Sequence, residues 1–173
     1  MNLLLYGFGL YDNHESNISA QLVEGLGLPF NVQREIFEVR FDRGMFVEAI
    51  DRHDPDIILG LGQSARSRRI RIERKALNRM GERSEAKRPI SRRGPDHLFM
   101  TLGIPGNGRA RLSYDAGTYV CNFSMYVIAQ HCRGSGKRLG FIHLPKHAGG
   151  MAATFVGDLI EKLGQPRQPT LDA

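Results

Sequence analysis

The sequence predicts an α/β fold, a three-layer α/β/α sandwich around a mainly parallel, twisted sheet. Apolar strand-like runs alternate along the chain with segments of helical apolar spacing, and this alternation is typical of parallel strands joined by helices. The continuous apolar run at 57–62 is bounded by turn residues, as expected for a central strand buried on both faces. In such a sheet, ligands collect beyond the carboxyl ends of the strands.

The first half of the chain supplies three strands and two helices. An apolar run ends at Gly7 and gives the first strand, and a loop then leads to Asn17 or Ser19, either of which suits a helix N-cap. Gly27 and Pro29 end that helix. The predicted elements are a strand at 2–6, a helix at 18–26, a strand at 32–40, a helix at 46–50 and the central strand at 57–62.

The second half supplies three further strands and two helices around a long polar stretch. The glycines Gly134 and Gly136 end one helix, and Pro145 stops the last strand. The predicted elements are a strand at 70–78, a polar, exposed excursion at 79–97, a strand at 98–104, a turn at 105–108, a helix at 118–132, a strand at 139–144 and a helix at 152–163.

Length and composition indicate a globular protein with one domain. The chain has 173 residues, of which 41% are hydrophobic and 24% charged; we expect a single domain over 1–164 and a disordered, Pro-rich tail over 165–173. No apolar run reaches the roughly 18–20 residues that cross a bilayer. The short apolar N-terminus lacks a basic region and reads as a strand. With two cysteines and no export signal, we expect the reducing cytoplasm.

Positive charge is concentrated in one block of the sequence. From Arg66 to Arg93 there are twelve Arg and Lys residues against three Glu, a net charge of +9, in a chain whose total is +6. Such a block is able to bind nucleic acid or another polyanion. A solvated basic loop, or a surface for subunit contacts, is the simpler explanation of the block, so we expect no nucleic-acid partner.

Cys121 lies where a loop turns into a helix. Asp115, Gly117 and Thr118 are turn and helix-start residues, and helical apolar spacing follows from Tyr119 onward. The unpaired N–H groups and the positive dipole end of a first helical turn favour a thiolate, which is a nucleophile. The alternative is that Cys121 is simply a small buried side chain.

Two further residues complete a set of nucleophile, base and orienting group. His143 lies in the strand-like run Phe-Ile-His-Leu-Pro, and Glu73 lies in the alternating run Ile-Arg-Ile-Glu. Cysteine, histidine and glutamate are distant in sequence, as they are when a fold brings a catalytic set together.

Other candidate sites are weaker. Gly7 and Gly9 follow the first strand, but the third glycine of a dinucleotide loop falls on Asp12, whose charge repels a pyrophosphate. His143 and His147 have the spacing of a helical zinc pair, but Pro145 between them forbids a regular helix, so we expect no metal and no cofactor.

Four separated patches of the chain carry a family resemblance. They are Gly7 to Tyr11 followed by Asn17 to Ser19, the segment from Gly62-Gln63 through Glu73 to Asn78, the cysteine motif Ala116 to Asn122, and the histidine motif Gly140 to Pro145. In this order they resemble the pyrrolidone-carboxylate peptidases, the cysteine peptidases that remove an N-terminal pyroglutamyl residue from a peptide.

The resemblance implies a role for each residue of the site and a homo-oligomer. It implies Cys121 as nucleophile, His143 as general base and acid, and Glu73 as the group that orients His143. The other residues that it implies are Arg83, ten positions after Glu73 and near the oxyanion, Phe8 and Tyr11 around the lactam ring, and Asn17 and Gln63 as polar groups beside that ring.

The chain departs from the family pattern in its middle region. Ala65, Arg66 and Ser67 stand where the family has Gly-Gly-Arg, and the interval between the glutamate and cysteine motifs is shortened. Two alternatives therefore stand beside a thiol peptidase that releases pyroglutamate. One is the same site acting on another small amide, and the other is a non-catalytic module that binds polyanions through the Arg66–Arg93 block.

Overall fold

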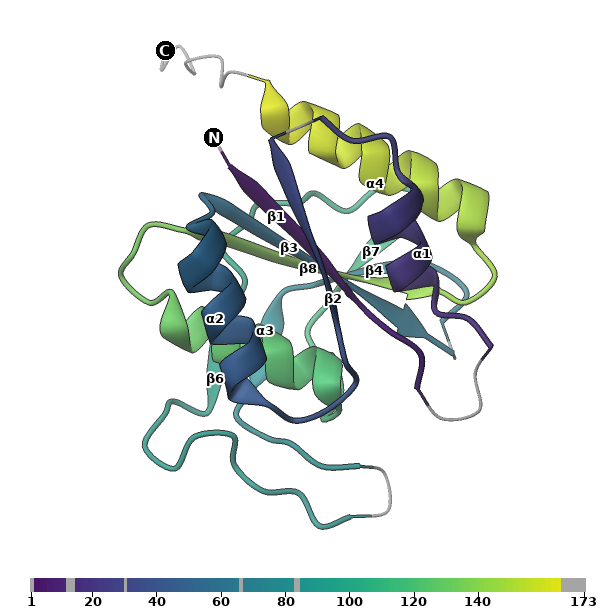
Figure 1. Cartoon of the computed structure of the whole chain (residues 1–173). Coiled ribbons are helices and arrows are strands. Elements are labelled where there is room, and N and C mark those ends of the chain that lie inside the picture. Colours follow the sequence, from purple (N-terminus) through teal and green to yellow (C-terminus); the bar gives the residue numbers. More distant parts are fainter. Residues whose placement is uncertain (1, 12–14, 30, 66, 83–84, 166–173) are drawn as a thin grey trace, which may run out of the picture.

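A six-stranded mixed sheet forms the centre of the molecule (Figure 1). The computed structural model describes residues 2–11, 15–29, 31–65, 67–82 and 85–165. The strand order is β2-β1-β3-β8-β4-β7. The strands of this sheet are β1 (Leu3–Phe8), β2 (Val32–Phe37), β3 (Ile57–Ser64), β4 (Ile70–Glu73), β7 (Ala110–Ser113) and β8 (Arg138–Pro145).

Four strands run parallel and two run the opposite way. Strands β2, β1, β3 and β8 pair in parallel, whereas β4 pairs antiparallel with β8 and parallel with β7. The expectation of a mainly parallel sheet is therefore confirmed, and the reversal falls between β8 and β4.

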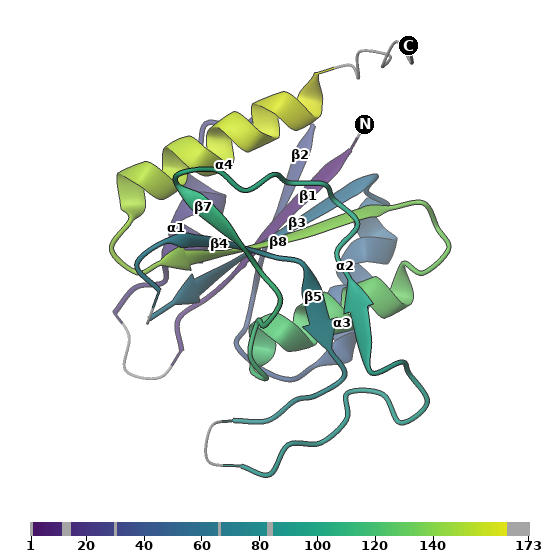
Figure 2. The same cartoon turned by 180° about the vertical axis from the view of Figure 1, so that it is seen from behind.

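Helices cover both faces of the sheet, which confirms the three-layer α/β/α prediction (Figures 1 and 2). Leu3 and Leu5 of β1 face one core with α1 and α4, whereas Leu4 and Tyr6 face the other core with α2 and α3. A two-stranded hairpin packs beside α3. These elements are α1 (Ile18–Gly25), α2 (Arg43–His53), α3 (Val120–His131), α4 (Gly149–Gly164), β5 (Lys75–Leu77) and β6 (His97–Phe99).

The predicted strand at 70–78 is wrong as a single element. The chain leaves the main sheet at Arg74, whose N–H donates to the carbonyl of Ser113 at 2.7 Å and whose guanidinium donates to the carbonyl of Leu102 at 3.1 Å. Ile70 and Ile72 are fully buried in β4, but the alternation ends at Glu73, and the following residues pair as β5 in the hairpin.

The next two elements also differ from expectation. Of the predicted strand at 98–104 only Leu98 and Phe99 are in a strand, β6, because the chain then turns inward to bury Met100 and Leu102. Strand β7 was not predicted, since two of its four residues, Arg111 and Leu112, are exposed at the edge of the sheet and show no apolar alternation.

Two helix starts matter for the site. Asn17, and not Ser19, is the N-cap of α1: its side-chain oxygen accepts the N–H of Ser19 at 3.0 Å. Helix α3 begins at Val120, so Cys121 lies in its first turn as predicted, and no side chain caps that end.

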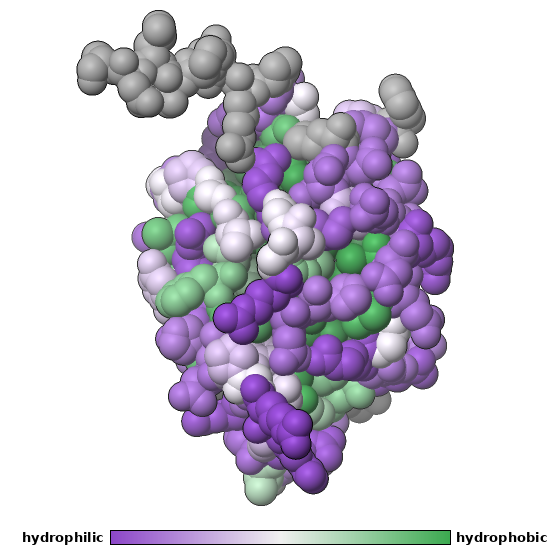
Figure 3. All heavy atoms as spheres, turned by 90° about the vertical axis from the view of Figure 1, so that its left-hand side faces the viewer, coloured by the Kyte–Doolittle hydropathy of each residue, from purple (hydrophilic) through white to green (hydrophobic). Residues whose placement is uncertain are grey.

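The surface is mostly hydrophilic on the face shown in Figure 3, with small separate hydrophobic areas. Within the described part of the chain, no helix is both long and apolar enough to cross a membrane. The predicted tail at 165–173 falls, apart from Gln165, outside the described residues.

Candidate active site

The sheet brings the candidate residues together through strand register. Gly62 of β3 pairs with His143 of β8, near the carboxyl ends of both strands. On the other side of β8, the antiparallel pairing sets Arg71 directly opposite His143 and Glu73 opposite Phe141. Because side chains alternate along a strand, Arg71 and Glu73 project from the same face of β4, and Ile70 and Ile72 from the other.

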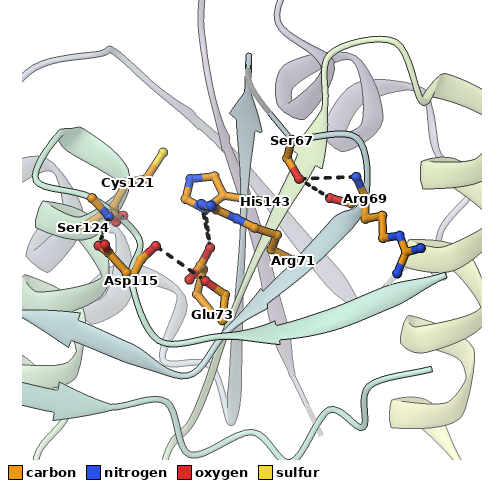
Figure 4. A network of polar contacts seen from close by, with 10 residues as sticks. Ser67, Arg69, Arg71, Glu73, Asp115, Cys121, Ser124 and His143 are labelled. Carbon is orange, nitrogen blue, oxygen red and sulfur yellow. Dashed lines mark hydrogen bonds and ion pairs between the residues drawn. The ribbon is translucent and has the colours of Figure 1, made fainter. Parts of the chain in front are cut away.

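The imidazole of His143 is held by a buried carboxylate (Figure 4). Nδ1 of His143 and Oε1 of Glu73 are 2.8 Å apart, with Glu73 1% exposed and His143 4% exposed. An ionised carboxylate only accepts hydrogen bonds, so Nδ1 carries a proton and donates a hydrogen bond to Glu73. The other ring nitrogen, Nε2, is left free to act as a base or, when protonated, as an acid.

The thiol of Cys121 faces this imidazole from the first turn of α3 (Figure 4). A Cβ atom on Gly62 would fall 2.8 Å from the sulfur and 2.9 Å from the ring of Phe141. Because Gly62 has no side chain, the thiol of Cys121 can lie against β3, next to the end of β8 that carries His143. The structure thus gathers Cys121, His143 and Glu73 into one cluster.

The charges of this cluster act on His143. Burial lowers the pKa of His143, but the neighbouring Cys121 and then Glu73, as negative charges and hydrogen-bond partners, outweigh burial and raise the pKa to about 9. The second cysteine lies in a different environment: Cys132 is 6% exposed, and burial raises the pKa of its thiol to about 11. Both cysteines are free thiols.

Hydrogen bonds of two buried side chains, Ser124 and Asn122, fix the helix that carries Cys121, and no pattern in the sequence pointed to this role. The hydroxyls of Tyr6 and Ser124 are 3.1 Å apart, and Ser124 donates to the carbonyl of Cys121 at 2.8 Å. Asn122 accepts the N–H of Leu77 at 2.8 Å and donates to the carbonyls of Leu77 and Arg79 at 2.9 and 2.8 Å. These bonds join α3 to β1 and to the hairpin.

A cavity of about 910 Å³ opens beside the cluster. His143, Arg71, Gln63 and Tyr11 line it, together with the loop 115–119 that leads into α3. Oε1 of Gln63 accepts the N–H of Ile18 at 3.0 Å, whereas its Nε2 is buried with no hydrogen-bond partner among the described residues. Gln63 therefore lines the cavity and keeps one amide N–H donor group without a partner among the described residues.

The remaining residues singled out from the sequence lie elsewhere. Phe8 is a core residue whose ring meets Tyr6 at 5.9 Å and Phe46 at 6.5 Å, between centroids. Asn17 is buried at the start of α1, where it also donates to the carbonyl of Gly9 at 2.9 Å. Arg83, predicted near the oxyanion, and Arg66 of the altered loop lie outside the described residues.

The cluster has the chemistry of a nucleophile with its base. The cluster places a thiol beside an imidazole, and that imidazole beside a buried carboxylate that fixes its tautomer. Covalent cysteine catalysis requires these three groups in this order. Within the described ranges, no group of three or more His, Cys, Asp or Glu side chains is placed to hold a metal ion.

Comparison with known proteins gives a family match over most of the chain. A family model described as pyroglutamyl peptidase matches residues 1–153. A pyrrolidone-carboxylate peptidase from Vibrio vulnificus is 32% identical over 164 residues, covering 83% of this chain and 77% of the relative. One from Saccharolobus islandicus is 30% identical over 172 residues, covering 85% of this chain and 80% of the relative.

Solved structures give the same fold. Pyroglutamyl peptidase I from Bacillus amyloliquefaciens superposes with a TM-score of 0.72 at 29% identity, covering 83% of this chain and 81% of that one. A variant of the pyrrolidone carboxyl peptidase from Pyrococcus furiosus gives a TM-score of 0.77 at 24% identity, covering 94% of this chain and all of that one; at that identity the likeness concerns the fold alone.

Proposed function

Because the chain belongs to the pyroglutamyl peptidase family, a family of cysteine peptidases, we propose that it hydrolyses the amide bond after an N-terminal pyroglutamyl residue. The products are free pyroglutamate and a peptide with a new amino terminus. The observation that carries the proposal is the cluster of Cys121, His143 and Glu73 beside a cavity large enough for a lactam ring. Residues 1–164 act as one catalytic domain in this proposal.

Acylation uses the thiol and the imidazole. The Cys121 thiolate attacks the pyroglutamyl carbonyl carbon, and a carbon–sulfur bond forms. Protonated His143 gives a proton to the departing nitrogen as the carbon–nitrogen bond breaks, which leaves a thioester and a free amine. Glu73, bonded to Nδ1 at 2.8 Å, holds the ring so that Nε2 makes this transfer.

Deacylation returns the enzyme to its starting state. Neutral His143 takes a proton from water, the hydroxide attacks the thioester carbonyl, and the carbon–sulfur bond breaks with Cys121 leaving as thiolate. The negative oxygen formed in both steps is stabilised by N–H groups of the first turn of α3, which no side chain caps. Arg83 is proposed as a second stabilising group at that oxygen.

The cavity wall supports recognition of a small neutral lactam. Such a ligand needs apolar contacts and a few fixed hydrogen bonds. We propose that Tyr11 contacts the ring and that the unpartnered Nε2 of Gln63 donates to the lactam carbonyl. In this proposal Phe8 and Asn17 act indirectly, by holding the end of β1 and the start of α1.

The two alternatives from the sequence have less support. The family match extends over residues 1–153, and it favours release of pyroglutamate over both another amide reaction and a polyanion-binding role for the Arg66–Arg93 block. We extend the proposal to a cytoplasmic homo-oligomer. Two free thiols fit a reducing compartment, and the exposed Leu112 of the edge strand β7 and Tyr114 just after it offer apolar surface for self-association.

A fluorogenic assay tests the function. The protein, under reducing conditions, is expected to hydrolyse pyroglutamyl aminomethylcoumarin and to leave prolyl aminomethylcoumarin, which lacks the lactam carbonyl, nearly untouched. Cys121→Ala removes the nucleophile and is expected to lower kcat by at least about a thousandfold. Cys132→Ala is the matched control and retains activity, because that thiol is buried far along α3. Turnover by the Cys121→Ala protein, or none by the wild type, would contradict the proposal.

A further inference from the structure

Arg71 is a cation within the cluster, and the proposed reaction gives it no part. Its Nη2 lies 3.0 Å from Oε1 of Glu73 and 3.2 Å from Nδ1 of His143. Since Nδ1 carries a proton and donates a hydrogen bond to Glu73, it cannot accept one from the guanidinium, which donates instead to the same carboxylate oxygen. Figure 4 shows the arginine lying alongside the imidazole and the carboxylate.

One further polar atom on each side of the pair is left without a hydrogen-bond partner. Nε of Arg71 and Oε2 of Glu73 are both buried and without partners among the described residues. These are the two atoms that a bidentate arginine–carboxylate pair would add to the existing bond. The side chain of Arg71 is 22% exposed and that of Glu73 is 0% exposed, so the arginine reaches from the cavity wall to a carboxylate that water does not reach.

The charge of Glu73 needs compensation at every stage of the cycle. A buried carboxylate is costly unless it is paired. Imidazolium compensates it in the resting enzyme, but His143 is neutral once it has protonated the leaving amine. At that stage Arg71, which stays charged, remains a cation in contact with Glu73.

We propose that Arg71 is a positioning residue of this peptidase site, which holds Glu73 ionised and aligned on His143 while the imidazole is neutral. The inference rests on the proposed function, since it concerns the acyl-enzyme stage of that reaction. The arginine and the glutamate are two positions apart on β4, and antiparallel pairing with β8 sets the arginine opposite the histidine.

Removing this cation changes the pH dependence of the site in a direction that follows from the surrounding charges. A positive charge favours the deprotonated form of its neighbours, so its loss makes each of them hold its proton to higher pH. Both the acidic and the alkaline limb of the plot of kcat/KM against pH are therefore expected to move to higher pH. The titratable and charged groups that face the cluster are Glu73 on β4, His143 on β8, Cys121 on α3, Tyr6 on β1, and Glu82 and Asp115 at the cavity wall.

The test compares kcat/KM for the pyroglutamyl substrate against pH in matched variants. Arg71→Gln is expected to shift both limbs upward by about one pH unit and to lower kcat near neutral pH by about tenfold. Arg71→Lys keeps the charge and is expected to keep the limbs within about 0.3 pH unit of the wild type. Arg69→Gln removes the same charge from a neighbouring exposed arginine that points away from His143, and is expected to match the wild type (Figure 4).

A second readout separates this inference from the proposed function. The rate of alkylation of Cys121 by iodoacetamide, measured against pH by mass spectrometry, needs no peptidase turnover. Arg71→Gln is expected to move that profile to higher pH as well, and Arg71→Lys is not. Alkylation profiles that coincide in all variants, or a fall in kcat with both limbs unmoved, would overturn the positioning role. A missing peptidase activity with shifted alkylation profiles would overturn only the proposed reaction.

Discussion

The protonation state of His143 sets the working pH range of the site. Its raised pKa, about 9, means that the imidazolium is present below that pH and lost above it. The proposed acylation step needs that proton for the leaving amine. We therefore expect kcat/KM for pyroglutamyl amides to be maintained from neutral pH into the weakly alkaline range and then to fall with an apparent pKa of about 9.

Glu73 contributes to the raised pKa of His143. Its removal is therefore expected to move the alkaline limb of the pH profile to lower pH, whereas removal of Arg71 moves it to higher pH. Glu73→Gln takes away an anion that stabilises imidazolium, so the alkaline limb is expected to move down by roughly one to two pH units. His147→Gln, at an exposed histidine four residues along the chain, should leave the limb in place. An alkaline limb near the ordinary histidine pKa in the wild type would show that the surrounding charges do not act as described.

At the residue scale, the thiol, the imidazole and the carboxylate could be predicted because each lies in a short local pattern. Cys121 follows helix-start residues, and His143 and Glu73 lie in strand-like runs. Arg71 could not be assigned, because its place depends on the antiparallel pairing of β4 with β8, and the sequence indicated a mainly parallel sheet. The available signal was its spacing of two from Glu73, which puts both on one face of a strand.

The link between α3 and the hairpin depends on one side chain at the element scale. Asn122 is fully buried and makes three hydrogen bonds to the backbone at Leu77 and Arg79. Asn122→Ala leaves the N–H of Leu77 and the carbonyls of Leu77 and Arg79 without these partners in a partly buried contact, so we expect the free energy of unfolding in urea to fall by about 2–3 kcal/mol.

A matched asparagine serves as control. Asn107 is exposed in the turn before β7, where its side chain accepts the N–H groups of Arg109 and Ala110, each at 2.9 Å. Asn107→Ala is expected to cost less than about 1 kcal/mol, because water replaces its bonds. Equal losses in the two variants would mean that the contacts of Asn122 do not hold the hairpin against α3.

Long, strongly patterned elements were predictable, and short edge elements were not. Strands β1, β3 and β8 and the helices α1 and α3 have apolar runs that match their burial. The break between β4 and β5 depends on hydrogen bonds from Arg74 to residues 28 and 39 positions further along the chain, which no local pattern records. Strand β7 depends on its partner β4 and carries little apolar signal of its own.

The whole molecule is positively charged, and the excess is concentrated in one block of the sequence, which includes Arg71 and Glu73 of the active site. The block from Arg66 to Arg93 carries a net charge of +9 and contains β4, β5 and much of the irregular segment that connects β5 to β6 (Figure 2). A second cavity of about 440 Å³ adjoins the first at Ala65, and Arg68 and Lys146 line it. Glu82 and Asp115 oppose these cations at the main cavity.

This distribution predicts a charge preference in the residue that follows pyroglutamate. With a net charge of +6, the molecule attracts acidic peptides through long-range electrostatics. Salt weakens this attraction, because the screening length falls from roughly 30 Å at 0.01 M to about 8 Å at 0.15 M ionic strength. We expect kcat/KM to be about two- to threefold higher for pyroglutamyl-Glu than for pyroglutamyl-Lys peptides at low salt, and nearly equal at high salt.

The double variant Arg92→Gln/Arg93→Gln removes two exposed charges of the block without touching the cavity, and it should reduce the low-salt preference. Arg133→Gln, at an exposed residue just after α3, removes charge outside the block and should change the preference less. Measurement of kcat/KM for the two peptides across a salt series decides the question. A preference for the Glu peptide that persists unchanged at high salt would show that it arises from direct contacts within the cavity. A preference for the Lys peptide would mean that Glu82 and Asp115 dominate the electrostatic field at the substrate.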